Sequence, residues 1–157
     1  MKLLLNNISH LKSSIEVIGG LIIETRLSIS KEGISIISND PANVAMVIFK
    51  ILSSAFITYE LEKPIELGIK IKDISDVLKK SRDGDTLTIE YEEPKLVFTL
   101  KGKTLRNFKI NTFDIEEKGY KVLDLKFDYE IKTKSSLIKD AIDTCDIIKD
   151  DVGVYLV

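Results

Sequence analysis

At 157 residues and 44% hydrophobic, the chain is long enough to bury the core of one domain and part of a second, which predicts a globular protein. Its single cysteine, Cys145, excludes an intramolecular disulfide, and its single histidine, His10, excludes a multi-histidine metal site, so redox and zinc chemistry are not expected. The formal net charge of −2 neither requires nor excludes a nucleic-acid partner, because a local basic face is enough for phosphate contact.

Hydropathy patterns in the first half of the chain predict one helix among short strands. The apolar run at 1–5 is too short for an export signal, so we expect a cytoplasmic protein. Gly33 is expected in a hairpin turn, and Pro64 between the last two strands. The expected elements are a strand at 2–6, a helix at 9–20, and strands at 23–30, 34–38, 44–50, 58–62 and 65–70.

The second half of the chain repeats these patterns. Asp83, Gly84 and Asp85 are expected to end a second helix. The expected elements are a helix at 72–82, strands at 86–92, 96–101 and 104–111, a polar stretch at 112–123, a strand at 125–132, a helix at 135–148 and a short strand at 152–157. A third strand-helix unit therefore begins near residue 125.

The three expected helices recur at one interval. Leu11, Ile74 and Leu137 occupy equivalent positions, each 63 residues after the one before. Each helix also carries one apolar stripe, which predicts that one face packs on a sheet. The stripes are Leu11, Ile15 and Ile18 in the first helix, Ile74, Val77 and Leu78 in the second, and Leu137, Ala141 and Ile148 in the third. Two units make a pseudo-symmetric domain, and the third begins another.

The segment from Asp40 to Val47 is the most distinctive in the chain. Pro41 fixes one backbone dihedral, and Asp40 and Asn43 can bond the local backbone, so a tight turn is expected before the strand that follows. Val44 and Met46 lie on one side of that strand and can simply be core residues. By itself this pattern predicts a loop and no function.

The same segment resembles the archaeal sliding clamps of the proliferating cell nuclear antigen family, and the resemblance extends over the whole chain. Further similar blocks are 73–80, 84–90, 114–117, 124–128 and 136–142. The resemblance implies an α+β protein with the DNA clamp fold, in which antiparallel sheets carry two helices per domain packed on one face. It also implies a complete N-terminal clamp domain at 1–111, an interdomain connecting loop at 112–124 and a partial second domain at 125–157.

As a family member, the chain is expected to be a DNA sliding clamp subunit and polymerase processivity factor, not an enzyme. The resemblance implies non-specific encircling of double-stranded DNA, and docking of DNA polymerase, flap endonuclease, ligase and clamp loader. The alternative is a clamp-like interaction scaffold that does not encircle DNA. No nucleotide loop or catalytic elbow is present, and His10 has no catalytic partner nearby in sequence, so no catalytic residue, cofactor or metal is expected; the carboxylates of Asp114, Glu116 and Glu117 are taken as solvated.

The resemblance also implies that polar helix faces line the hole of a ring, where lysines meet phosphates without reading sequence. A helical wheel places Lys72 and Lys79 opposite the apolar stripe of their helix. Acidic residues such as Glu16 and Asp76 share these faces, so a plain solvated surface is the alternative. The expected DNA-binding residues are Lys12, Lys72, Lys79, Lys80, Lys109 and Lys139.

A hydrophobic pocket between the Asp40–Val47 segment and the connecting loop is expected to accept a short partner peptide ending in paired aromatic residues. Three of its residues are apolar groups in an otherwise charged linker, which is typical of a docking site. Asn39 stands where many relatives have an apolar residue, which makes one wall more polar. The expected lining is Asn43, Val44, Met46, Tyr120, Val122 and Leu123.

Ring closure in this family joins edge strands of neighbouring subunits, and the strand at 105–110 is expected to supply one edge. The expected interface residues are Leu105, Arg106, Phe108 and Ile110. Because the second domain is partial, we expect a split clamp that pairs with a complementary half or with further clamp subunits, in preference to a truncated product. The resemblance also implies that the protein is nucleoid-associated and has no membrane partner.

Overall fold

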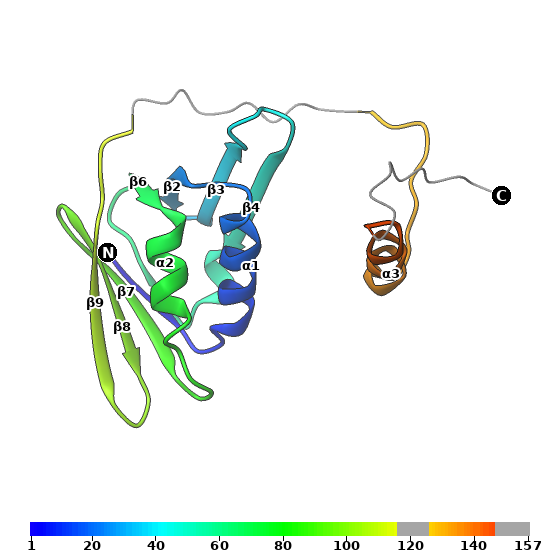
Figure 1. Ribbon diagram of the computed structural model, residues 1–157. Coiled ribbons are helices and arrows are strands. Elements are labelled where there is room, and N and C mark those ends of the chain that lie inside the picture. Colours follow the sequence, from blue (N-terminus) through cyan, green and yellow to red (C-terminus); the bar gives the residue numbers. More distant parts are fainter. Residues whose placement is uncertain (116–125, 147–157) are drawn as a thin grey trace. The chain divides into compact units, whose positions relative to one another are not determined.

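A computed structural model describes residues 1–115 and 126–146 and divides the chain into two units, Met1–Val122 and Leu123–Val157. The first unit contains antiparallel sheets and two α-helices (Figure 1). Its elements are β1 (Lys2–Leu5), α1 (Ser9–Gly19), β2 (Glu24–Ser30), β3 (Gly33–Asn39), β4 (Met46–Leu52), the 3-10 helix η1 (Ser53–Ala55), β5 (Thr58–Glu60), β6 (Ile65–Lys70), α2 (Ile71–Leu78), β7 (Thr86–Glu92), β8 (Lys95–Lys101) and β9 (Leu105–Asn111). In the second unit the described helix is α3 (Ser135–Asp146).

The strands of the first unit form two sheets, ordered β5-β1-β7-β8-β9 and β4-β3-β2-β6. β1 lies inside the first sheet, because Leu3 pairs with Tyr59 on one side and with Ile89 on the other. The sheets are joined where Gly68 and Phe113 exchange two backbone hydrogen bonds of 2.8 and 3.1 Å. A Cβ atom at Gly68 would lie 2.5 Å from Phe113, so glycine permits this close approach.

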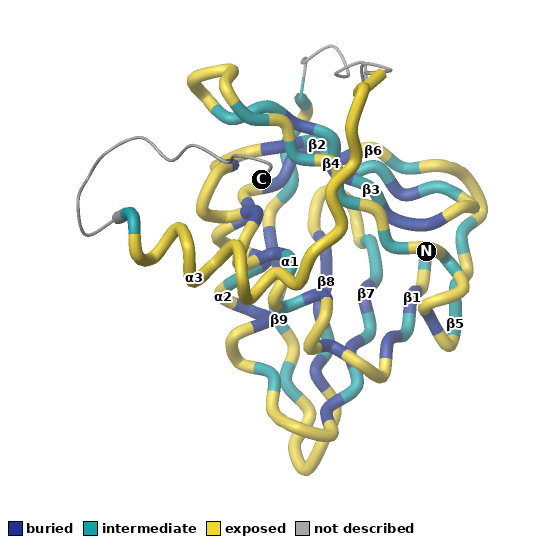
Figure 2. The backbone as a smooth tube through the Cα atoms, turned by 90° about the vertical axis from the view of Figure 1, so that its right-hand side faces the viewer, coloured by how far each residue is buried: buried dark blue, intermediate teal, exposed yellow. Residues whose placement is uncertain are grey.

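The core is formed by the apolar stripes of both helices and the inward faces of both sheets. α1 and α2 pack against each other, and Figure 1 shows them side by side. Buried and exposed positions alternate along the strands in Figure 2, as expected for sheets with one covered face. The helix residues in the core are Leu11, Ile15 and Ile18 of α1 and Ile71, Ile74, Val77 and Leu78 of α2. Phe98 and Leu3 are the largest fully buried side chains, each contributing about 1.5–3 kcal/mol by burial.

The hairpin between β2 and β3 depends on Gly33, as the sequence predicted. Its φ of 145° lies in a region that side chains disfavour. A Cβ atom at this position would lie 2.0 Å from the carbonyl oxygen of Ile51 on β4. Glycine therefore lets three neighbouring strands meet at the start of β3.

Several expectations about the elements are wrong. The strand expected from residue 44 begins at Met46, because residues 40–45 form a closed loop, and α2 ends at Leu78 instead of residue 82. Residues 126–132 form no strand, since no described strand pairs with them. The helix expected at 135–148 is confirmed as α3, but its apolar stripe is not buried: Leu137 is 59% exposed and Ala141 is also exposed. Ile148 and the strand expected at 152–157 lie outside the described residues.

Candidate functional site

The loop from Asp40 to Ala45 is built around one carboxylate. The Asp40 side chain accepts backbone hydrogen bonds from Ala42, Val44 and Ala45 at 3.2, 2.8 and 2.7 Å. The Asp40 N–H in turn donates to the Ala45 carbonyl at 2.9 Å, which closes the loop. These N–H groups, first that of Ala45, hold the pKa of Asp40 below its ordinary value. The turn predicted from the sequence is therefore present and held by its first residue.

Asn43 occupies the left-handed region, with a φ of 56°, and its N–H donates to the Asp40 carbonyl at 2.9 Å. Asparagine is one of the few residues that adopt this conformation at low cost. The Asn43 side chain does not bond the backbone as expected; its Oδ1 accepts from Asn39 Nδ2 at 3.3 Å. Asn39 therefore braces the loop, which also explains why a polar residue suits this position.

The loop presents apolar side chains to solvent. Val44 is 85% exposed and Met46 is 39% exposed, so the alternative that both are core residues is wrong. Because Val44 precedes β4, it does not share the alternating burial of that strand. The other three residues of the predicted pocket, Tyr120, Val122 and Leu123, lie outside the described residues. The pocket as a whole stays a prediction.

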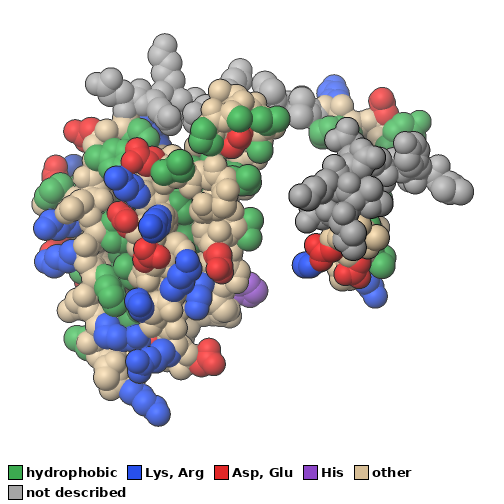
Figure 3. Space-filling view, viewed as in Figure 1, with side chains coloured by type: hydrophobic (Ala, Val, Ile, Leu, Met, Phe, Trp, Pro, Cys, Tyr) green, Lys and Arg blue, Asp and Glu red, His purple; other side chains and the backbone are tan. Residues whose placement is uncertain are grey.

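Four of the five predicted lysines of the first unit lie on α1 or α2 or directly after α2. Lys72, Lys79 and Lys80 are exposed on and just after α2, and Lys12 is half-buried on α1. Glu16 and Asp76 lie on the same helices, and Figure 3 shows basic and acidic side chains interspersed over this face. Between α1 and α2 lies an open groove of about 330 Å³, lined by Glu16, Gly19, Gly20, Ile22, Ile23, Lys72, Ser75 and Lys79. The charge of the face is therefore mixed, with cations nearest α2.

Two predicted DNA-binding lysines lie elsewhere. Lys109 is on β9, where its amine forms an ion pair with Glu92 at 2.8 Å. Lys139 is on α3 and pairs with Asp143 one turn later. The structure thus groups Lys12, Lys72, Lys79 and Lys80 and does not bring Lys109 onto the same helical surface.

β9 is an edge strand of the five-stranded sheet, as the sequence predicted. Leu105 is 64% exposed, and Phe108 is half-buried. Ile110 is buried inside its own unit, so its side chain is not available to a neighbouring chain without rearrangement. The predicted interface residues therefore divide between one exposed side chain, Leu105, and residues that are partly or fully buried in their own unit, and the interface itself stays a prediction.

Arg106 belongs to an internal network that the sequence did not reveal. Its guanidinium pairs with the carboxylate of Asp85 and donates to the Lys80 carbonyl at 2.5 Å. Asp85 also accepts the Arg82 N–H at 2.7 Å. The sequence predicted for Asp85 only a part in ending the helix, because residues 81–85 have the composition of an ordinary polar turn. Only a pairing of β7, β8 and β9 brings the two charges together.

Other chemistry is not indicated. Within residues 1–115 and 126–146, no group of three His, Cys, Asp or Glu side chains could hold a metal ion. His10 is exposed in the first turn of α1. None of the described helices is both long and apolar enough to cross a membrane.

Comparisons with known proteins agree with these features. The family model described as proliferating cell nuclear antigen, N-terminal domain, matches residues 1–130. A DNA polymerase sliding clamp of Methanothermobacter thermautotrophicus is 24% identical over 148 residues, covering 94% of this chain and 61% of that protein. Another from Thermococcus gammatolerans is 29% identical over 133 residues, covering 84% of this chain and 53% of that protein. The chain thus spans less than two thirds of the length of these relatives.

Solved structures show the same fold. A chain in the crystal structure of a PCNA2-PCNA3 complex from Sulfolobus tokodaii matches with a TM-score of 0.84 at 26% identity, over 94% of this chain and 61% of that one. PCNA from Thermococcus kodakaraensis matches with a TM-score of 0.75 at 23% identity, over 79% of this chain and 51% of that one. The predicted α+β clamp fold is confirmed. Since the family model covers most of the sequence, the chain belongs to the proliferating cell nuclear antigen family, and it contains the N-terminal domain of that family.

Proposed function

We propose that the chain is a DNA sliding clamp subunit that encircles duplex DNA without sequence preference and tethers replication and repair enzymes. The observation that carries this proposal is the match to proteins named DNA polymerase sliding clamps over 94% of the chain, together with the two-helix face that the fold exposes. The same proposal includes a clamp domain at 1–111, a connecting loop at 112–124, a partial second domain at 125–157, and action at the chromosomal DNA of the cytoplasm.

The face of α1 and α2 suits sliding because its positive charge is modest. Exposed lysines near α2 can meet phosphates, while Glu16 and Asp76 limit the total attraction. Each phosphate contact made by a lysine is weakened by salt and exchanges easily, so such a surface holds DNA without fixing its position.

The first test reverses the charges after α2. Lys79→Glu with Lys80→Glu is expected to shorten the products of clamp-dependent primer extension on circular DNA, because two phosphate contacts become repulsive. Lys31→Glu with Lys95→Glu makes the same charge change at two exposed strand ends and is expected to leave product length unchanged. Equal product lengths for both double variants would show that the helical face does not meet DNA.

A second test addresses partner docking. Val44→Glu is expected to reduce the affinity for a peptide ending in paired aromatic residues at least about fivefold, because it buries a carboxylate against an apolar ligand, at a cost of about 1–3 kcal/mol. Calorimetry measures the affinity, and thermal unfolding checks that the exposed substitution leaves the fold intact. Ile57→Glu, at a residue that is 58% exposed, is the control. Unchanged affinity in Val44→Glu would contradict docking at this loop.

The proposed partners are DNA polymerase, flap endonuclease, ligase, the clamp loader and further clamp subunits or a complementary half. The alternative, a scaffold that binds peptides without encircling DNA, is distinguished by how long the protein stays bound to circular and to linear DNA. A closed ring stays on circular DNA and slides off the linear form, whereas a scaffold dissociates from both at the same rate.

A further inference from the structure

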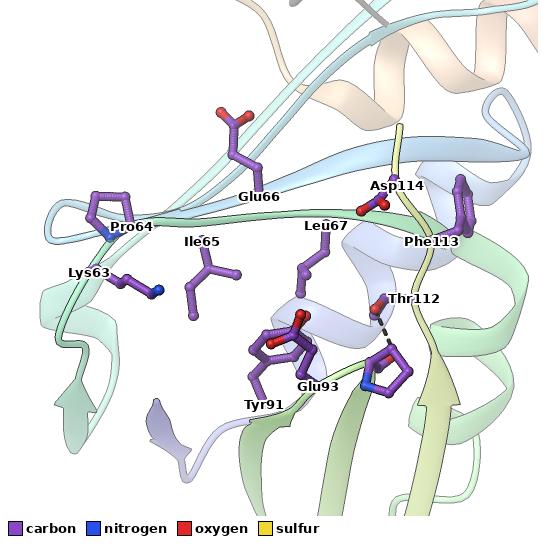
Figure 4. A pocket seen from close by; sticks show the side chains of 11 residues that line it. Lys63, Pro64, Ile65, Glu66, Leu67, Tyr91, Glu93, Thr112, Phe113 and Asp114 are labelled. Atoms are coloured by element: carbon purple, nitrogen blue, oxygen red, sulfur yellow. Dashed lines mark hydrogen bonds between the residues drawn. The ribbon is translucent and has the colours of Figure 1, made fainter. Parts of the chain in front are cut away.

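A second cavity, on a different part of the first unit from Val44 and Met46, opens where the two sheets diverge (Figure 4). It has a volume of about 480 Å³, within the roughly 300–1,000 Å³ usual for ligand sites. Its walls come from the start of β6, the turn between β7 and β8, and the chain leaving β9. The lining residues are Lys63, Pro64, Ile65, Glu66, Leu67, Tyr91, Glu93, Pro94, Thr112, Phe113 and Asp114.

The floor of this cavity contains apolar side chains. Figure 4 shows Ile65 and Leu67 pointing from β6 to the side on which Tyr91 and Glu93 lie. Leu67 is buried, whereas Ile65 and Tyr91 are half-buried and keep part of their surface open. An apolar side chain of a ligand can therefore rest here and lose contact with water.

Backbone contacts hold the walls in place before any ligand arrives. Thr112 donates to the Pro94 carbonyl from its N–H at 3.0 Å and from its hydroxyl at 2.7 Å, which joins the turn to the end of β9. The paired hydrogen bonds between Gly68 and Phe113 join the same segment to β6. The site is therefore preformed, and binding a ligand costs little conformational entropy of the protein.

The rim of the cavity carries an excess of negative charge. Glu66 is already paired with Arg26 at 3.0 Å, and Figure 4 shows its side chain directed away from the cavity floor. In the part of the chain that the structure describes, Glu93 and Asp114 form no ion pair. Lys63 is the one cation among the lining residues. Among the lining residues, Glu93 and Asp114 outnumber the single cation Lys63, and together with the apolar side chains of the floor they favour a ligand that is cationic and partly apolar.

We propose that this cavity binds a short peptide segment of a partner protein in which arginine is flanked by aliphatic residues. The guanidinium lies between Glu93 and Asp114 and stacks on Tyr91, where a planar cation gains more than an ammonium group. An adjacent aliphatic side chain covers Ile65 and Leu67. This site shares no residue with the Asp40–Val47 loop and does not rest on the function proposed above.

The test uses the full 157-residue chain and the capped peptide acetyl-Leu-Arg-Leu-amide. Titration followed by 15N–1H NMR is expected to give saturable shifts at residues 63–67, 91–94 and 112–114, with a Kd on the order of 1 mM for so small a ligand. The isosteric peptide with citrulline in place of arginine has no charge and is expected to bind about tenfold more weakly.

Matched variants locate the cation. Glu93→Gln with Asp114→Asn is expected to weaken the arginine peptide about tenfold, the sum of two rim charge pairs. Glu16→Gln with Asp76→Asn removes the same charge from the helices and is expected to change nothing. The proposal is overturned by absent or unsaturable shifts, by equal affinity for the citrulline peptide, by equal affinity in the Glu93 and Asp114 variant, or by shifts at residues 40–47.

Two results separate this site from the aromatic-peptide site. Val44→Glu is expected to leave the arginine peptide bound as in the wild type, and the Glu93 and Asp114 variant is expected to leave the aromatic peptide bound. Loss of aromatic-peptide docking alone would contradict the proposed function and leave the arginine site standing.

Discussion

Asp85 is buried where α2, β7 and β9 meet, and its carboxylate joins them. It accepts the Arg82 N–H at 2.7 Å, after the end of α2, and pairs with Arg106 of β9. The Arg82 N–H, followed by Arg106, lowers the pKa of Asp85 although burial alone would raise it. A Cβ atom at Gly102 would lie 1.9 Å from Asp85 Oδ1, so the turn between β8 and β9 also leaves room for this group.

The lowered pKa of Asp85 predicts an acid-sensitive contribution to stability. The folded pKa lies below the ordinary value of 3.8, so the contribution is complete above about pH 4 and is lost as pH falls through the folded pKa. Asp85→Asn is expected to lower the urea midpoint of unfolding at pH 7. The difference in midpoint between the variant and the wild type is expected to become smaller as the pH falls from 4 to 2. Urea titrations across this range measure both effects, and a difference that is constant with pH would contradict the assignment.

At the scale of elements, local pattern predicted most of the first unit. The strand expected at 86–92 coincides with β7, because its alternation matches a sheet with one covered face. α2 ends before the expected residue 82 because the chain after Leu78 forms tighter turns. Lys80 and Ser81 donate to carbonyls three residues back, and the Arg82 N–H donates to the Asp85 carboxylate. Helical periodicity contains no signal for that contact.

The candidate site was predictable only in part for a related reason. The Asp40 turn followed from local residue types, and the exposure of Val44 did not, since its apolar character equally suits a core strand. Leu105 and Ile110 lie five residues apart on one strand, so alternation places them on opposite faces, and the packing of the sheet decides that the face of Ile110 is the buried one.

α3 differs from α1 in the burial of its apolar side chains. The α1 stripe of Leu11, Ile15 and Ile18 is buried, whereas Leu137, Ile138 and Ile142 of α3 are 59%, 52% and 51% exposed. Most helical stability in proteins comes from packing of the apolar face, and an isolated helix of this length is marginal in water.

We therefore expect faster amide exchange in α3 than in α1. Hydrogen exchange followed by mass spectrometry is expected to show α3 amides labelled at least about a hundredfold faster than those of α1, because opening α1 also requires unpacking the core. Comparable protection of the two helices in the isolated chain would contradict this and would indicate that the apolar face of α3 is covered in solution.

At the scale of the whole molecule, the four-stranded sheet ends in a strand whose exposed row is apolar except for Lys50. β4 is an edge strand of this sheet, and its Met46, Ile48 and Leu52 are 39%, 57% and 55% exposed. An exposed, apolar edge offers unpaired backbone groups to another chain and favours association through strand pairing.

The purified chain is accordingly expected to self-associate as concentration rises. Sedimentation equilibrium is expected to give an average mass above 17.7 kDa at high concentration. Ile48→Lys is expected to shift association to concentrations about tenfold higher, because a charge at an edge opposes pairing. Val17→Lys, on α1 at a residue that is 71% exposed, is the control and is expected to behave as the wild type. Equal shifts of the association concentration for both variants would indicate that association depends on general surface hydrophobicity and not on strand pairing at β4.

The position of β1 has a consequence for how the protein is made on the ribosome. β1 is the first strand synthesised, yet it must receive β7 as a neighbour, and β7 starts roughly 80 residues later. At about 5–20 residues per second, translation needs on the order of ten seconds to deliver β7. During that interval the backbone groups of β1 that later pair with β7 have no strand partner. We expect the nascent chain to depend most on chaperones in this period.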